Sequence, residues 1–189
     1  MARKSQTEKA ESRARILSAA ARLIREKGIE QTSVAQVMDL AGMTHGGFYR
    51  HFDSKNHLIT EAIGEAFHAG LDVFDETQAG NRDQAKAYVD QYISDQHIRT
   101  PEIGCPLPVL SSEVARGTDE WQEALCRGLD RATTKLAEGV EGAKQSDTLV
   151  ILGLLVGTLS LARGIGEGPL REQLVEASEK HIRTMMNLD

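Results

Sequence analysis

The stretch GMTHGGFYRHFDSKNHL, residues 42–58, decides the interpretation of this chain, because glycines, aromatic rings and basic groups crowd into the length of one short helix. Phe48 and Phe52 stand four residues apart, so on a helix they share one face and are expected to be buried. The other faces then carry small, basic and hydroxyl-bearing residues. Ser54 follows and can cap a longer helix that begins near Lys55.

Two further helices are expected before this stretch. Apolar residues recur at helical spacing across Ser12–Lys27, and Gly28 suits the left-handed residue that ends a helix. Ser33 begins a capping-box pattern for a second short helix, which Gly42 ends. Thr44 can cap the third. Short helices joined by a glycine-containing turn are typical of a helix-turn-helix, whose second helix can enter the major groove of DNA.

The rest of the chain is expected to be helical as well, because glycine, proline and polar breaks separate six helical segments and no strand-length alternation occurs. The expected helices are Lys55–Phe74, Arg82–His97, Pro106–Ala115, Asp119–Gly139, Asp147–Ile165 and Pro169–Asn187. The sequence therefore predicts an all-α fold of about nine helices, with a three-helix helix-turn-helix domain at residues 1–54 and a helical bundle at residues 55–189.

Charge is unevenly distributed along the 189 residues. Residues 1–55 hold ten Lys or Arg against six Asp or Glu, whereas residues 56–189 hold twelve against twenty-two, for a net charge of −6. A cationic first segment on an anionic body favours a polyanionic partner for that segment alone.

Several features favour a cytoplasmic protein with no membrane association. The N-terminal residues are polar, without the apolar core of a signal peptide. The longest apolar run, Leu149–Ala162, is shorter than the roughly 20 residues that span a bilayer. Cys105 and Cys126 are the two cysteines of the chain, which fits a reducing compartment.

The exposed residues of the opening stretch have the chemistry of a DNA-binding surface. Arg50 can bind guanine O6 and N7 or a phosphate, and Tyr49, His51 and Thr44 suit phosphate oxygens. Lys55 adds its charge to a helix N-terminus, where phosphate binds well. A simpler interpretation stays open, in which Tyr49 and His51 are half-buried amphipathic residues and Arg50 is solvated.

Gly46 and Gly47 follow His45 near the start of the expected third helix. Two glycines there cost roughly 1 kcal/mol each in helix stability. Without side chains, they let another molecule approach the backbone closely, which is one explanation for that cost.

The segment of residues 32–58 resembles the signature of the TetR family of bacterial repressors; its sequence is TSVAQVMDLAGMTHGGFYRHFDSKNHL. In that signature a short helix and an AG turn are followed by Y-x-H-F-x-S-K-x-x-L and then by a long helix. The resemblance is tight over residues 12–62 and covers the remaining body by length and helix count. It implies a homodimer that binds a palindromic double-stranded DNA operator through its N-terminal domains, and C-terminal domains that dimerise and bind a small-molecule inducer.

The resemblance implies that nine residues at matching positions contact DNA: Ser33, Thr44, His45, Gly46, Gly47, Tyr49, Arg50, His51 and Lys55. The pair after His45 departs from the family, whose second position there often carries a side chain. With fewer side chains to reach the bases, specificity is expected to depend on Arg50 and on DNA shape.

The resemblance also assigns the last two helices, about residues 147–187, to a four-helix dimer interface. The segment TLVILGLLVGTLSLARGI, residues 148–165, is apolar nearly all round, so both of its faces should be buried. The competing interpretation is that these helices form the core of a monomeric bundle.

In the family the inducer enters between the middle helices. Apolar and aromatic side chains there supply the candidate ligand-binding residues Tyr88, Tyr92, His97, Cys105, Leu110, Trp121 and Leu125. Most aromatic residues at helical spacing are ordinary core, and that explanation stays open for each of them.

Cys105 is a candidate sensor. Pro106 suits the first position of a helix, which would place Cys105 at the N-cap, where the helix dipole favours the reactive thiolate. His97 and Arg99 can add positive charge. Members of the TetR family that respond to electrophiles are similar here, with a G-C pair before a helix, which implies release of DNA by thiol modification. The competing interpretation is a small, buried apolar residue.

No catalytic residue, metal site or cofactor is expected. The six histidines are scattered, and H-x-x-x-H, C-x-x-C, G-x-S-x-G and phosphate-loop spacings do not occur. Two other functions remain as alternatives to a DNA-binding regulator. One is a helical carrier or sensor of small molecules that acts through protein partners, and the other is a helical enzyme.

Overall fold

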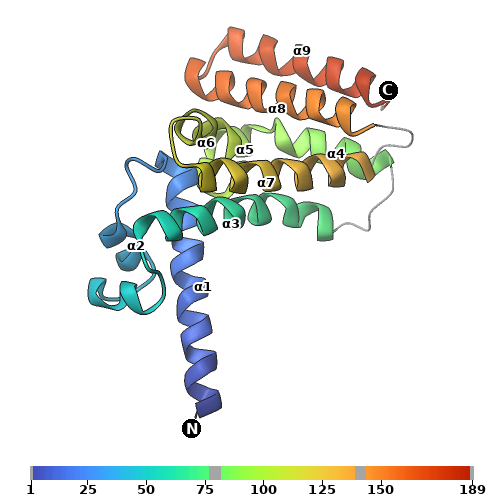
Figure 1. The fold of residues 1–189 in the computed structure, drawn as a ribbon. Coiled ribbons are helices and arrows are strands. Elements are labelled where there is room, and N and C mark those ends of the chain that lie inside the picture. Colours follow the sequence, from blue (N-terminus) through green and yellow to red (C-terminus); the bar gives the residue numbers. More distant parts are fainter. Residues whose placement is uncertain (1, 77–81, 139–143, 188–189) are drawn as a thin grey trace.

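The computed structural model describes residues 2–76, 82–138 and 144–187, which form nine α-helices and two short 3-10 helices, η1 and η2 (Figure 1). In chain order these are α1 Ala2–Lys27, α2 Val34–Leu40, η1 His45–Arg50, α3 Lys55–Glu76, α4 Arg82–Tyr92, α5 Asp95–Arg99, η2 Pro101–Ile103, α6 Leu107–Val114, α7 Asp119–Glu138, α8 Gln145–Ile165 and α9 Pro169–Met185. The predicted all-α class is confirmed.

The helices form a small head and a layered body (Figure 1). In the head, α2 packs on α1 and on η1. The long helix α3 belongs to both parts, since it packs against α1 and against α7. On the far side of α7 lies α8, and α9 covers α8 as the outermost layer. The helix-turn-helix therefore lies at one end of the bundle, and α1 and α3 connect it to the body.

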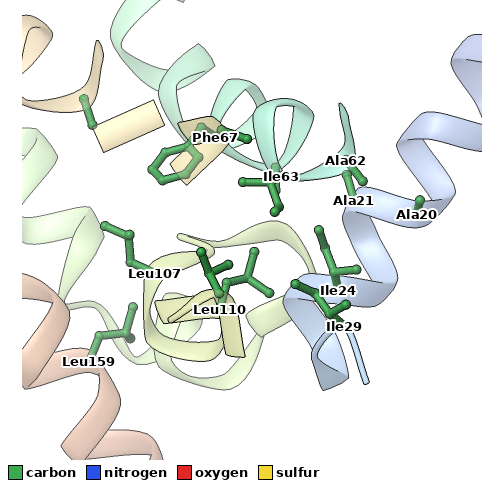
Figure 2. Close-up of a cluster of buried hydrophobic side chains, with 14 of the residues drawn as sticks. Ala20, Ala21, Ile24, Ile29, Ala62, Ile63, Phe67, Leu107, Leu110 and Leu159 are labelled. Atoms are coloured by element: carbon green, nitrogen blue, oxygen red, sulfur yellow. The ribbon is translucent and has the colours of Figure 1, made fainter. Parts of the chain in front are cut away.

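The core where head and body meet is formed by α1, α3 and α6 (Figure 2). Ile24, Ile63 and Leu110 come from these three helices and are completely buried. Fully burying one such side chain stabilises the fold by roughly 1.5–3 kcal/mol. Because α6 contributes to this core, its position is tied to that of the head.

Two predicted helices differ from the structure in extent. The first begins at Ala2 rather than Ser12, because the polar residues before Ser12 include no Gly or Pro that would break a helix. The segment predicted as one helix, Arg82–His97, is two: α4 ends at Tyr92, and Ser94 caps α5 by accepting a hydrogen bond from the His97 N–H at 3.2 Å. The side-chain cap competes locally with continuation of the helix.

By length and composition alone, α8 could cross a membrane, a test that the buried core helix of a soluble protein also passes. It packs here between α7 and α9. Part of its apolar surface stays exposed, with Val150 at 60% and Leu161 at 56%.

Candidate functional site

The start of the helix-turn-helix is built as the sequence predicts. The Ser33 hydroxyl accepts a hydrogen bond from the Gln36 N–H at 3.2 Å, and the Gln36 side chain accepts one from the Ser33 N–H at 3.0 Å. This reciprocal capping box satisfies backbone donors at the start of α2. Gly42, with φ of +67°, then makes the left-handed turn that ends it.

The third helix is a 3-10 helix and not the predicted α-helix. Gly47 N–H donates to the Thr44 carbonyl at 3.0 Å, and His51 N–H donates to the Phe48 carbonyl at 2.9 Å. Adjacent glycines at positions 46 and 47 have weak α-helical preference, which permits the tighter winding. The predicted cap at Thr44 is wrong in one respect, because its side chain makes no capping hydrogen bond.

The two phenylalanines fix which side of η1 is presented to solvent. Phe48 and Phe52 are buried and stack with ring centroids 5.9 Å apart, as predicted. The Tyr49 ring meets Phe48 edge-on and is 72% exposed. Of the nine residues predicted to contact DNA, those exposed are Ser33, Thr44, His45, Gly46, Tyr49, Arg50 and Lys55, while Gly47 and His51 are half-buried.

Ser33 and Lys55 are exposed but already have partners within the head. The Ser33 hydroxyl serves the capping box, and the Lys55 ammonium donates to the Ile29 carbonyl at 3.4 Å, a long hydrogen bond. A bond of this length at an exposed position is weak. Lys55 therefore keeps donors for another partner, while Ser33 acts chiefly in the capping box.

Positive charge surrounds His51. Burial lowers the pKa of His51, and the charges of Lys9, Arg50 and Arg13 lower it further. Its Nδ1 is buried and has no hydrogen-bond partner among the described residues. Lys9 was missed by the sequence analysis because the helix was expected to begin after it; extension of α1 to Ala2 brings this exposed lysine to the same surface.

The orientation of the head on α3 is held by Arg13. Its guanidinium bonds both carboxylate oxygens of Glu61, at 2.6 and 2.7 Å, and lies over the Phe52 ring at 4.6 Å. His57 reaches the same carboxylate at 2.8 Å. The pKa of Glu61 is lowered, because the hydrogen bonds and charges of Arg13 and His57 outweigh the effect of its burial. This cluster joins α1, α3 and the end of the helix-turn-helix.

The body contains a cavity of about 120 Å³ between α3, α4, α5, the η2 segment, α6, α7 and α8. Four residues predicted to bind ligand line it, namely Tyr88, Tyr92, His97 and Cys105. The structure thus brings these four together from α4, α5 and the loop after η2. Phe67, Leu107 and Leu152 were not nominated and form much of its apolar wall.

The other three nominated residues lie elsewhere. Leu110 is completely buried in the core between α1, α3 and α6 (Figure 2). Trp121 packs against Gly117 at the turn between α6 and α7, and Leu125 is partly buried against the core. The prediction that they line the inducer cavity is not supported, because helical spacing marks burial without distinguishing core from cavity wall.

His97 is neutral and held by backbone groups. Its Nε2 accepts the Cys105 N–H at 2.9 Å, so the proton lies on Nδ1, which donates to the Tyr92 carbonyl at 2.6 Å. Burial lowers the pKa of His97, and the nearby Arg163 charge lowers it further, against the raising effect of the Tyr92 carbonyl. The predicted positive charge from His97 is therefore wrong. Exposed Arg99 bonds Asp95 at 2.6 Å and pairs with Glu167.

This neutral state predicts a dependence of stability on pH. Because the pKa of His97 is lower in the folded than in the unfolded chain, the unfolded chain takes up a proton first, and stability falls as pH drops below about 6.5. His97→Gln should make this fall shallower, by up to about 1.4 kcal/mol per pH unit. Urea unfolding at several pH values measures it, with His181→Gln as the control for loss of a histidine. Equal slopes in wild type and His97→Gln would contradict this assignment.

Cys105 is not the N-cap that the sequence predicts, since α6 begins at Leu107 and Pro106 occupies the cap. Burial raises the pKa of the Cys105 thiol, although the Tyr92 hydroxyl, the Leu107 backbone and the charges of Arg163 and Arg25 oppose this. The predicted thiolate at a helix start is therefore wrong. Cys105 remains a free, half-buried thiol in the cavity wall, whereas Cys126 is exposed on α7.

Two contacts connect this cavity wall to the head. Arg25 of α1 donates to the Glu102 carbonyl in η2 at 2.8 Å and to the Ala66 carbonyl of α3 at 3.1 Å. Glu113, farther along α6 than the cavity residue Leu107, accepts the N–H groups of Ile29 and Glu30 at 2.6 and 3.3 Å. These hydrogen bonds connect η2 to α1 and α3, and connect α6 to the segment that joins α1 to α2.

Comparison with known proteins finds one family model that matches the head. The family model for bacterial regulatory proteins of the tetR family matches residues 16–62, which include α2, η1 and the start of α3. This segment of the chain is similar to the tetR family. The resemblance of the helix-turn-helix to this family is thereby confirmed.

Bacterial transcriptional regulators are similar to this chain over different lengths. The transcriptional regulator TtgR of Pseudomonas putida is 37% identical over 68 residues, which cover 36% of this chain and 32% of TtgR. The chain thus spans about a third of the length of that relative. The transcriptional repressor NemR of Escherichia coli is 23% identical over 147 residues, 76% of this chain and 74% of NemR.

Solved structures extend the similarity of fold to the body. Reduced NemR of E. coli superimposes with a TM-score of 0.74 at 19% identity, over 93% of this chain and 97% of NemR. A TetR transcriptional regulator from Chloroflexus aurantiacus gives 0.75 at 22% identity, over 96% of each chain. At these identities the similarity concerns the fold alone.

Proposed function

We propose that this protein is a ligand-responsive transcriptional repressor of the TetR family that binds a palindromic double-stranded DNA operator in the cytoplasm. The observation that carries the proposal is the surface of η1, which presents Thr44, His45, Tyr49 and Arg50 to solvent within a cationic environment. Arg50 reads a base edge or binds phosphate, and the hydroxyls of Tyr49 and Thr44 bind phosphate. The exposed, side-chain-free Gly46 lets the backbone approach the groove.

The protein acts as a homodimer through α8 and α9. Large apolar side chains stay exposed on both helices: Leu149, Val150, Leu161, Ile165, Leu170 and Met185. A Cβ added at Gly153 or Gly157 would meet no atom within 4 Å, so a partner helix can approach closely there. Several large apolar side chains exposed on two neighbouring helices favour an interface there. Two heads then bind half-sites about 34–36 Å apart, or one helical turn of DNA.

The cavity beside Cys105 receives the inducer. Occupation of the cavity, or a covalent adduct on the Cys105 thiol, displaces η2 and α6, which Arg25 and Glu113 connect to the head. Displacement of the two heads from their spacing on DNA lowers operator affinity. NemR is similar in fold and is named a transcriptional repressor, which agrees with this account.

Selection of fragments from a genomic pool, followed by footprinting of the bound DNA, tests this proposal. The expected result is a palindrome with two protected half-sites separated by one helical turn. A carrier or sensor that acts only through protein partners would enrich no fragment. A helical enzyme, the third alternative, would instead show turnover that substitution of His97 or Cys105 removes.

Thiol modification makes a separate prediction. N-ethylmaleimide should release the wild-type protein from its operator by adding bulk to Cys105 within the cavity wall. Cys126→Ser should behave like the wild type, whereas Cys105→Ser should stay bound. Because burial raises the pKa of Cys105, release should become faster as pH rises from 7 to 9. Release of Cys105→Ser at the wild-type rate would exclude Cys105 as the sensor.

A further inference from the structure

The inducer cavity is lined by neutral residues. Of the fifteen described residues that form its wall, none is Asp, Glu, Lys or Arg. Its polar side chains include Gln91, Ser94, Gln96 and Thr100, and also His97, whose nitrogens are both engaged by backbone groups. A charged ligand would lose its hydration without gaining a counter-charge in this wall. The wall therefore favours a neutral molecule.

One polar group in the wall lacks a strong hydrogen-bond partner. The Tyr92 side chain is 96% buried, being 4% exposed, and its hydroxyl has no nitrogen or oxygen partner among the described groups; the nearby Cys105 thiol is at best a weak one. The ring is fixed, because it meets His97 edge-on at 4.9 Å and contacts Tyr88 at 5.6 Å between centroids. A buried hydroxyl without a good partner is unfavourable, because it has lost its hydrogen bonds to water. A ligand that pairs with it would replace one of them.

Positive charge lies just behind the same part of the wall. Arg163 donates to the carbonyls of Ile98 at 3.1 Å and His97 at 2.8 Å, while its Nη1 is buried without a hydrogen-bond partner in the described part of the chain. A Cβ added to Gly104, a cavity residue, would lie 3.3 Å from the Arg163 Nη2. This charge favours an electron-rich atom beside Tyr92, so the hydroxyl is suited to donate.

We infer that Tyr92 is the hydrogen-bond donor by which the cavity selects a small, neutral molecule with an acceptor oxygen, such as a ketone. The cavity, at about 120 Å³, is somewhat smaller than the roughly 150 Å³ engineered cavity that binds benzene, so the ligand is about the size of one six-membered ring. The inference rests on the proposed function, in that this cavity is the inducer site. Recognition is non-covalent and consumes no thiol.

A matched pair of probes tests the inference. Cyclohexanone and methylenecyclohexane have nearly the same shape and differ in the acceptor oxygen. Their dissociation constants for the DNA-free protein can be measured by NMR chemical-shift titration. Cyclohexanone should bind wild type about fivefold more tightly, as expected for one net hydrogen bond. Tyr92→Phe should abolish this preference, and cyclohexanecarboxylate should bind at least about tenfold more weakly than the ketone.

Equal binding of the two neutral probes to wild type, an unchanged preference in Tyr92→Phe, or no binding of either probe would each overturn the inference. Thermal unfolding provides a second measurement: loss of a hydroxyl that lacks a strong partner should leave the melting temperature of Tyr92→Phe equal or higher, whereas loss of a structural hydroxyl would lower it. These titrations use no DNA. Failure of the proposed regulator function would instead appear as loss of operator binding, with the probe preference unaffected.

Discussion

Replacement of both Arg50 and Lys55 by alanine is expected to weaken operator binding by at least about a hundredfold. Arg50 is exposed on η1, and Lys55 lies at the start of α3 with only a weak hydrogen bond to Ile29. Loss of a base or phosphate contact costs about 1–3 kcal/mol, and two such losses give this factor. Fluorescence anisotropy with the selected operator measures the affinity. The slope of log affinity against log salt should also become shallower by about 0.9 per lost phosphate contact.

The control for this variant removes the same charge from the body. Arg127 on α7 and Lys86 on α4 are exposed, so Arg127→Ala with Lys86→Ala changes the net charge equally without altering the head. The control should bind DNA like the wild type. Both double variants should keep the wild-type thermal stability, because exposed substitutions usually change it by less than about 0.5 kcal/mol. Equal DNA affinity for the two double variants would remove η1 from the proposed interface.

Glu113→Ala is expected to lower the free energy of unfolding by about 2 kcal/mol and to weaken the response to inducer. The Glu113 carboxylate accepts two backbone N–H groups from residues 29 and 30, and charge-assisted hydrogen bonds are worth about 1.5–3 kcal/mol. The nearby ion pair between Arg116 and Glu30 is exposed, at 3.9 Å, and contributes little. Without Glu113, movement of α6 is transmitted less effectively.

Two measurements on this variant separate stability from coupling. Urea unfolding gives the first, with Ser112→Ala as a control at an exposed neighbour on α6. The second is the ratio of operator affinities before and after Cys105 alkylation, which should fall several-fold in Glu113→Ala relative to wild type. Glu113→Gln keeps one acceptor oxygen, so its ratio of operator affinities should lie between those of the wild type and Glu113→Ala. An unchanged ratio would show that the signal reaches the head by another route, such as Arg25.

Local features of the fold were predictable from the sequence. The Ser33 capping box and the burial of Phe48 and Phe52 depend on residues within four positions of each other, so a helical pattern contains the information needed. The winding of η1 as a 3-10 helix was not predictable in this way. Adjacent glycines weaken α-helix formation without specifying what replaces it.

The environment of Cys105 required the tertiary structure. Sequence placed it beside Pro106 and suggested a helix N-cap, but its actual surroundings come from segments far along the chain. His97 binds its N–H, Arg25 comes from α1, and Arg163 comes from α8. The tertiary structure was also needed to distinguish cavity residues from core residues among the candidates, since Tyr92 lines the cavity while Leu110 fills the core. Helical periodicity indicates that a side chain is buried, but it does not indicate which other residues surround that side chain.

Binding of the purified protein to a short duplex from the DNA upstream of its own gene, at two salt concentrations, tests the central claim most directly. The account predicts tight binding that weakens steeply with salt and exceeds binding to a scrambled duplex of equal length by at least about a thousandfold, as specific regulators do. Equal binding to both duplexes, together with no enrichment from a genomic pool, would contradict it. The helix-turn-helix would then be a protein contact, and the body a small-molecule sensor without DNA.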